Sequence, residues 1–263
     1  MSDLVKVNAK ELSQSEEVQK KFKEILGDNY KFFMQSVVNS INLNDKLLEC
    51  EGLSVWSAAM NAAVLGLPID NNLSYAAIIP FGKKAQFQIM IKGYIQLAID
   101  TGLYESIHVT EVYEDELDYH DPIRDQTHFT DKDEWNQRMS GQKNKIIGYF
   151  AYIKYKNGFY KEKFMWKKDV ETHGKTYSKS FKYGVWKDNF DAMGKKTVLK
   201  LLLRNYGKLG KDSQKLNMAL EADQGFTSNL NINEISYDDN PKNDTEYEVS
   251  IEDEFNEENP IKA

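Results

Sequence analysis

Two short apolar segments joined by a tight turn constrain the fold of this chain more than any other feature. They flank the turn Gly82-Lys83-Lys84, and the second segment runs directly into a helix that begins near Ile91. Apolar segments on either side of a glycine-containing turn are typical of a β-hairpin. The pattern therefore predicts two strands and then a helix between residues 66 and 101.

The polar side chains of this stretch suit a nucleic acid. Lysines can neutralise phosphates, and an aromatic ring can stack on a base. Nothing in the stretch has the pattern of a catalytic base or nucleophile. The candidate DNA contacts here are Lys83 and Lys84 at the turn, Gln86 and Gln88 on one face of the second strand, and Lys92 and Tyr94 at the helix start.

The rest of the chain reads as further helices and strands. The alternation around Asn157-Gly158 is a strong hairpin signal, and Gly66 ends an alanine-rich helix. Residues 114–142 and 174–184 lack a clear pattern and are expected to form loops, the first with weak strands. The expected helices are 15–26, 28–41, 54–65, 91–101, 167–175, 185–206 and 213–221, and the expected strands are 104–113, 145–155 and the return to Trp166.

Charge is segregated along the chain. The whole protein has a net charge of −7, but residues 221–263 hold thirteen acidic and two basic residues. Residues 143–215 hold nineteen basic and six acidic residues. A strongly basic part within an acidic protein is the pattern expected of a nucleic-acid binder, although a solvated lysine surface is the alternative. The acidic tail has few residues that could pack, which is typical of disorder.

Two basic clusters lie inside the basic part. Lys196, Lys200 and Arg204 recur every four residues and would form one stripe, with successive members about 6 Å apart along the helix axis. A loop is expected to hold Lys175, Lys179 and Lys182, interleaved with Tyr177, Phe181 and Tyr183. Both clusters are candidate DNA contacts, and a solvated surface is the alternative for each.

The acidic residues between Glu114 and Asp121 allow three interpretations. They can form a solvated loop, contact a partner or subunit, or hold a divalent metal for a nuclease. Nuclease ligands normally come from separate rigid elements, whereas these are nearly consecutive. We therefore expect no metal site and no other cofactor.

Several classes of protein are disfavoured by missing features. The chain lacks a phosphate-binding G-x-x-x-x-G-K-[ST] loop, a Cys/His zinc cluster and a long apolar span. An ATP-driven recombinase and a membrane protein are therefore not expected. The single cysteine, Cys50, excludes an intramolecular disulfide and fits the cytoplasm.

Ordered fragments of the sequence resemble the RecT family of phage single-strand annealing proteins. The resemblance spans roughly residues 20 to 222, with Ile91 standing where many members have a tyrosine. The matching fragments are LGL at 65–67, ID at 69–70, IPFG at 79–82, AQFQ at 85–88, KGYI at 92–95, LA at 97–98, TG at 101–102, WKD at 186–188, FDAM at 190–193 and KKT at 195–197.

This resemblance implies an α+β fold, with a small antiparallel sheet packed on a long helix and flanked by N-terminal helices. It implies ATP-independent annealing of single-stranded DNA to give duplex, by a homo-oligomeric ring or filament without a catalytic residue. We expect subunit contacts in residues 1–50, the annealing core in 51–222 and a disordered acidic tail in 223–263. The tail could contact a phage exonuclease or a host single-strand-binding protein. The alternatives are a metal-dependent phage nuclease and a passive protector of single strands.

Overall fold

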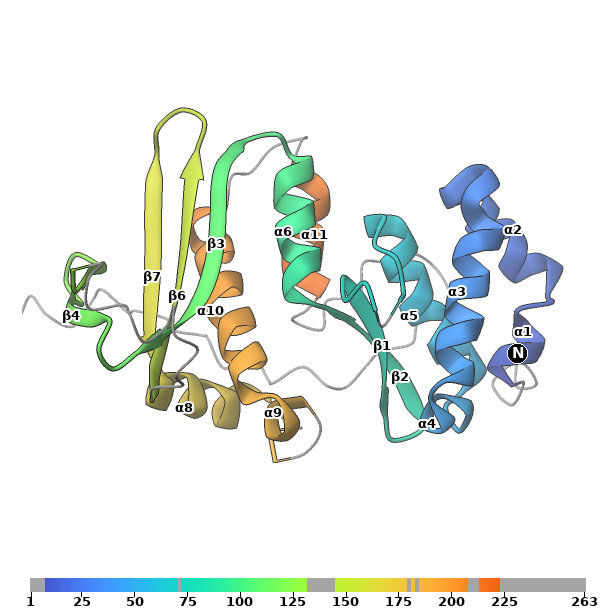
Figure 1. The fold of residues 1–263 in the computed structure, drawn as a ribbon. Helices are drawn as coiled ribbons and strands as arrows, with labels where there is room; N and C mark the ends of the chain where they lie inside the picture. Colours follow the sequence, from blue (N-terminus) through green and yellow to red (C-terminus); the bar gives the residue numbers. More distant parts are fainter. Residues whose placement is uncertain are drawn as a thin grey trace, which may run out of the picture.

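The structure, a computed structural model, describes residues 8–70, 72–131, 145–178, 181–182, 185–207 and 213–222. It combines three small antiparallel sheets with helices (Figure 1). Within this part of the chain, no helix is both long and apolar enough to cross a membrane. The predicted acidic tail from residue 223 lies outside the described residues.

The N-terminal helices pack around α5. They are α1 (Ala9–Leu12), α2 (Glu16–Leu26), the 3-10 turn Gly27–Asn29, α3 (Tyr30–Asn42), α4 (Asp45–Leu48) and α5 (Gly52–Leu65). The ring of Phe22 lies edge-on to Trp56 and stacks on Phe33, and the Trp56 indole donates a hydrogen bond of 2.7 Å to the Ala9 carbonyl. Phe22 and Trp56 are buried, so these rings belong to the core that joins the N-terminal helices to α5.

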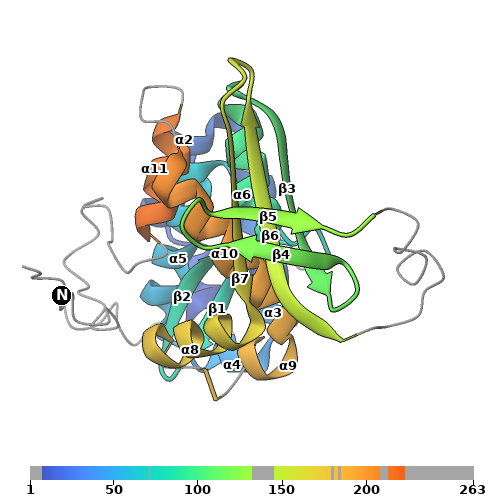
Figure 2. The same ribbon diagram turned by 90° about the vertical axis from the view of Figure 1, so that its left-hand side faces the viewer.

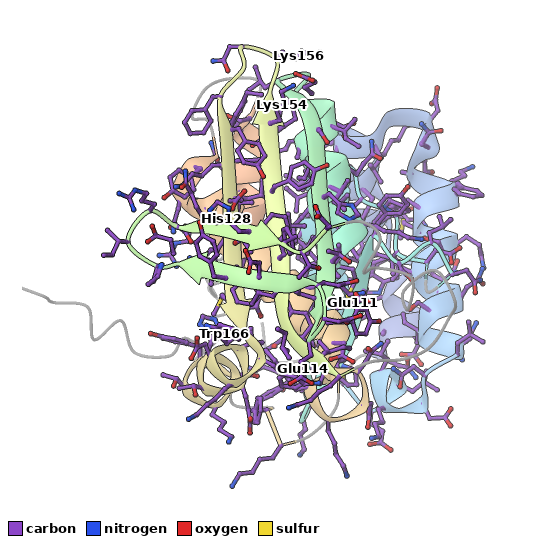
Figure 3. All side chains as sticks on the ribbon, turned by 60° about the vertical axis from the view of Figure 1, so that its left-hand side comes forward. Glu111, Glu114, His128, Lys154, Lys156 and Trp166 are labelled. Atoms are coloured by element: carbon purple, nitrogen blue, oxygen red, sulfur yellow. The ribbon has the colours of Figure 1, made fainter. Side chains whose placement is uncertain are left out.

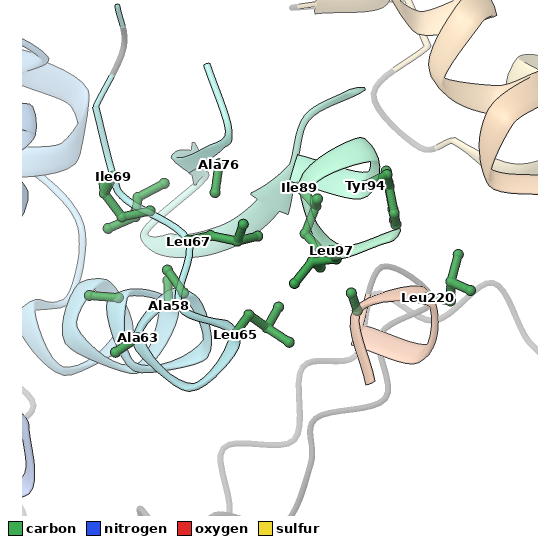
Figure 4. Packing of buried hydrophobic residues seen from close by; sticks show 14 of the residues in the cluster. Ala58, Ala63, Leu65, Leu67, Ile69, Ala76, Ile89, Tyr94, Leu97 and Leu220 are labelled. Atoms are coloured by element: carbon green, nitrogen blue, oxygen red, sulfur yellow. The ribbon is translucent and has the colours of Figure 1, made fainter. Parts of the chain in front are cut away.

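The first hairpin rests on α5. Strands β1 (Ala76–Phe81) and β2 (Lys84–Ile89) pair through six residues each. Alanines of α5 are buried and let the strands approach closely, and the Ala85 N–H donates a 2.8 Å hydrogen bond to the Ser54 hydroxyl. Side chains from α5, β1–β2, the following helix α6 (Ile91–Asp100) and α11 (Gln214–Ala222) meet in one buried cluster (Figure 4).

The second half of the chain forms a three-stranded antiparallel sheet in the order β3-β6-β7. Its strands are β3 (Tyr104–Tyr113), β6 (Ile146–Tyr155) and β7 (Tyr160–Trp166). The longest helix, α10 (Phe190–Tyr206), packs on one face of this sheet and also contacts α6 and α11 (Figure 1). The short helices α8 (Lys167–Tyr177) and α9 (Val185–Asp188) lead from β7 to α10.

A small hairpin lies across the other face of the sheet. Its strands, β4 (Leu117–Asp121) and β5 (Gln126–Phe129), run across β6 and β7 in Figure 2. A separate apolar cluster beneath it contains Val112, Phe150 and Phe164. The sheet therefore has a helical layer on one side and a partial hairpin cover on the other.

The predicted fold class is confirmed. A small antiparallel sheet packs on a long helix, with helices at the N-terminus. The weak strands expected within residues 114–142 are present, and the expected loop at 174–184 was wrong in part. Residues 117–129 form the ordered β4–β5 hairpin because their few apolar side chains pack on the sheet, and α8 continues to Tyr177.

Gly93 provides a test of the packing between α6 and the segment before β1. A Cβ atom at this position would lie 2.3 Å from the carbonyl oxygen of Tyr75, a backbone atom that cannot simply rotate away. Replacing glycine by alanine inside a helix normally stabilises a protein by about 1 kcal/mol. Here we expect Gly93→Ala to destabilise the fold by about 1 to 3 kcal/mol, because the helix must shift.

Urea denaturation measures this effect. Ile99→Ala, on the exposed side of the same helix, is the control and should change the midpoint little. A Gly93→Ala protein as stable as the wild type would show that α6 is less tightly packed than described.

Candidate nucleic-acid interface

The β1–β2 hairpin places two of the predicted contacts, Gln86 and Gln88, on one face. Gln86 and Gln88 pair with Ile79 and Ala77 and so share one face of the hairpin, opposite the face that carries buried Ala85 and Ile89. Both glutamines are half-buried. Their arrangement on one face is confirmed, whereas their contact with DNA stays a prediction.

The two lysines at the hairpin turn are held near the start of α5. The Glu51 N–H donates a 2.7 Å hydrogen bond to the Lys83 carbonyl, which fixes the turn. The Lys83 side chain is exposed and Lys84 is half-buried. Lys92, on the first turn of α6, is also exposed. The hairpin turn and the start of α6 thus each carry an exposed lysine.

The stacking role expected of Tyr94 was wrong. Its side chain is fully buried, in one helix face with Leu97 and Ala98. This face packs against α10 and α11, so no base can reach the ring. The spacing i, i+3, i+4 of Tyr94, Leu97 and Ala98 is typical of a buried helix face, and it was the sequence signal for the burial of Tyr94.

Helix α8 carries part of the predicted basic-aromatic segment. Lys175 is exposed and lies 2.6 Å from the Glu171 carboxylate, which lowers the pKa of Glu171. Tyr177 is 60% exposed, whereas Phe181 packs against Trp186 and above Gly174. Lys182 is exposed, and Lys179 and Tyr183 lie outside the described residues. Tyr177 is therefore the ring of this segment best placed for stacking.

The predicted basic stripe of α10 is only partly exposed. Lys196 is 5% exposed, Lys200 is half-buried and Arg204 is exposed. The expectation that Lys196 lies on an open face was wrong, because α10 is covered by the sheet and by α6, α8 and α11. Replacing Lys196 would disturb packing as well as charge.

Charges from α8 and α10 lie in one region. Burial lowers the pKa of His173 on α8, and the positive charge of Lys200 lowers that pKa further. The His173 ring lies 4.7 Å from the ring of Tyr177. The positive charge of Lys200 on α10 is thus close to α8, which carries the exposed ring of Tyr177.

A polar network holds the start of α10 on the sheet. The Tyr149 hydroxyl donates a 2.5 Å hydrogen bond to Asp191, and Lys167 lies 3.3 Å from the same carboxylate oxygen. Lys195 forms a 2.9 Å ion pair with Glu111. Burial and the carboxylate of Asp191 raise the pKa of Tyr149. Sequence reasoning missed this network because its members are far apart in the chain.

The acidic residues near β4 have local structural roles. Glu116 is buried and accepts a 2.9 Å hydrogen bond from the Tyr113 N–H. Asp121 pairs with Arg124 at 2.8 Å, and these hydrogen bonds lower the pKa of the Asp121 carboxyl. No group of three His, Cys, Asp or Glu residues in the described ranges is placed to hold a metal ion.

The described surfaces carry several exposed lysines and the exposed ring of Tyr177. Comparison with known proteins defines the class. A profile of the RecT family matches residues 31–241. The chain is also 40% identical to the uncharacterised protein YqaK of Bacillus subtilis strain 168 over 244 residues, 91% of this chain and 82% of that protein.

This chain belongs to the RecT family, as its sequence fragments suggested. It is a single-strand annealing protein of DNA recombination, and it binds single-stranded DNA. Proteins of this family are in general not catalytic enzymes.

The His173–Lys200 interaction predicts how stability depends on pH. The pKa of His173 in the folded protein is below its ordinary value of 6.5, so the unfolded chain binds the proton more tightly. The stability contributed by neutral His173 is fully present above about pH 6.5 and is lost as pH falls through the folded pKa. His173→Gln should therefore flatten the dependence of the urea midpoint on pH below 6.5.

Lys200→Met tests the second cause of the lowered His173 pKa, the positive charge of Lys200. Removing this positive charge should raise the pKa of His173 towards 6.5, measured by nuclear magnetic resonance of the imidazole. Lys187→Met removes an exposed lysine of α9 and is the matched control. An unchanged His173 pKa in Lys200→Met would contradict the described proximity of α8 and α10.

Proposed function

We propose that this chain anneals complementary single strands without ATP, as an oligomer that holds one strand through its phosphates. The observation that carries the proposal is the positive charge of Lys200 on α10 close to α8. The Lys200 charge acts on His173 of α8, where Lys175 is exposed, and Arg204 is exposed one turn beyond Lys200 on α10. A surface with these cations neutralises phosphates and leaves the bases available for pairing.

Further lysines extend the candidate contacts beyond this surface. Lys83 at the β1–β2 turn, Lys92 on α6 and Lys182 before α9 are all exposed. A lysine ammonium is a point charge that suits contacts to the phosphate backbone of DNA. Arginine, by contrast, can donate two parallel hydrogen bonds to one base. The proposed binding is therefore largely independent of sequence.

The first test removes two cations from α10. Lys200→Ala with Arg204→Ala should weaken single-strand binding and slow annealing. The negative slope of log affinity against log salt should become shallower by about 1.4, at roughly 0.7 for each lost phosphate contact. Circular dichroism should show an unchanged fold, because neither side chain is fully buried.

Lys20→Ala with Lys23→Ala is the matched control. It removes the same charge from exposed positions of α2, away from the proposed surface, and should leave the slope unchanged. A wild-type slope in the α10 variant would contradict phosphate contacts there. Binding without faster pairing would support a passive protector, and metal-dependent cleavage of labelled strands would support a nuclease.

The proposed subunit contacts lie on the N-terminal helices. Phe32 is 83% exposed and Leu43 is 77% exposed, at the two ends of α3. Large apolar side chains this exposed are typical of an association surface when they recur on one element. The division into residues 1–50 for assembly, 51–222 for annealing and 223–263 as an acidic tail stays part of this proposal.

Substitution of both apolar residues tests the assembly. Phe32→Asp with Leu43→Asp should shift the protein to smaller species in sedimentation velocity, because burying an unpaired carboxylate in an apolar contact is unfavourable. Gln214→Asp, an exposed polar position of α11 outside the N-terminal helices, should leave the distribution unchanged. Wild-type assembly by the double variant would place the subunit contact elsewhere.

A further inference from the structure

Three aromatic rings gather on the sheet face opposite α10. His108, Tyr152 and Tyr160 come from the three neighbouring strands β3, β6 and β7. The ring centroids of His108 and Tyr152 are 6.0 Å apart, and those of Tyr152 and Tyr160 are 5.8 Å apart. Tyr160 is 47% exposed and His108 is exposed, so the β4–β5 hairpin leaves this end of the sheet accessible.

Two lysines border the rings. Lys154 lies on the same sheet face, paired across the strands with Tyr160, and forms a 2.6 Å ion pair with Glu105 of β3. Lys156 lies in the adjoining turn and is exposed (Figure 3). The β6–β7 segment from 146 to 166 holds four lysines and one glutamate. That glutamate, Glu162, is engaged through both oxygens, which accept hydrogen bonds of 2.6 Å from the Thr127 N–H and the Tyr160 hydroxyl.

The hydrogen bond to Glu162 also fixes the Tyr160 ring. Burial and this carboxylate raise the pKa of Tyr160, so its hydroxyl stays protonated and remains the donor. Tyr152 is half-buried between its neighbours and is held by the sheet. Rings that are already oriented lose little conformational freedom when a flat ligand stacks on them.

We propose that His108, Tyr152 and Tyr160, with Lys154 and Lys156, form an aromatic patch that stacks bases of a single nucleic-acid strand. The rings supply the stacking surface, and the lysines supply the charge that complements the phosphates. The inference rests on the proposed function and adds to it. α10 covers the opposite face of the sheet, so the patch is a second strand contact separate from the proposed α8–α10 surface.

Two separate contacts suit annealing. A strand held by its phosphates at the α8–α10 surface keeps its bases free, while the aromatic patch can hold bases of the incoming strand before pairing. Stacking is tolerant of sequence, because every base has a flat face. The patch therefore binds an unpaired strand in preference to a duplex, whose bases are already stacked.

Tyr152→Ala with Tyr160→Ala in the full-length protein tests the patch. Anisotropy with labelled oligothymidylate should show binding weakened by about tenfold, with the salt slope unchanged because no phosphate contact is lost. If Tyr152→Ala disturbs the sheet, the single variant Tyr160→Ala takes the place of the double variant. Its position is well exposed, and it should weaken binding about threefold. Tyr160→Phe keeps the ring but loses the hydrogen bond that orients it, and should bind more tightly than Tyr160→Ala.

Tyr119→Ala is the matched control. This ring on β4 is 52% exposed but lies outside the patch, stacked on His128, and its loss should leave binding unchanged. A second readout needs no variant. Irradiation of wild-type protein with an iodouracil-substituted strand should attach the strand to a peptide within residues 146–161.

The outcomes separate this inference from the proposed function. Wild-type protein that binds and anneals strands, while the tyrosine variants match it and no adduct forms in 146–161, overturns the aromatic patch alone. Wild-type protein that does not bind single strands overturns the proposed function and the patch together. An equal loss of affinity in Tyr160→Phe and Tyr160→Ala would also overturn the patch, because it would assign the effect to the hydroxyl.

Discussion

The contact between Tyr149 and Gly194 fixes the position of α10 on the sheet. Tyr149 is fully buried, and a Cβ atom at Gly194 would lie 2.5 Å from its ring. Only a glycine lets the helix approach this closely. The Tyr149 hydroxyl then reaches Asp191 on the same helix. Since α10 also packs on α6 and α11, this contact joins the sheet to the N-terminal half of the protein.

The crowded surroundings of α10 decide where its charge can act. A helix with neighbours on several sides has a wide buried arc, so Lys196 is enclosed along with Val198 and Leu202. Exposure increases towards Arg204, near the C-terminal end. The positive side chains there also complement the negative end of the helix dipole. The part of α10 that can meet a phosphate is thus its last two turns.

The two faces of the sheet have different chemical character. One is occupied by α10, and the other is partly covered by the acidic β4–β5 hairpin. That hairpin packs Leu117 and Phe129 on the sheet, and Glu116 and Asp121 accept hydrogen bonds from local backbone N–H groups. It leaves one end of the sheet uncovered, where aromatic and basic residues remain accessible. Separation of acidic and basic surfaces reduces competition between carboxylates and phosphates.

The sequence by itself determined the elements with strong local signals. The β1–β2 hairpin, the helix that ends at Gly66, the β6–β7 hairpin at Asn157-Gly158 and the long helix α10 follow from turn residues and apolar periodicity. Ordered fragments along the chain also indicated the RecT family. These features depend on neighbouring residues, so they can be read without the fold.

The tertiary structure alone decided which polar side chains are accessible. Tyr94 and Lys196 were expected to be accessible, but helices from distant parts of the chain cover them. His108, Tyr152 and Tyr160 carry no motif, and only strand register brings them onto one face. Burial and cross-strand pairing depend on contacts between residues far apart in the sequence, which no local pattern specifies.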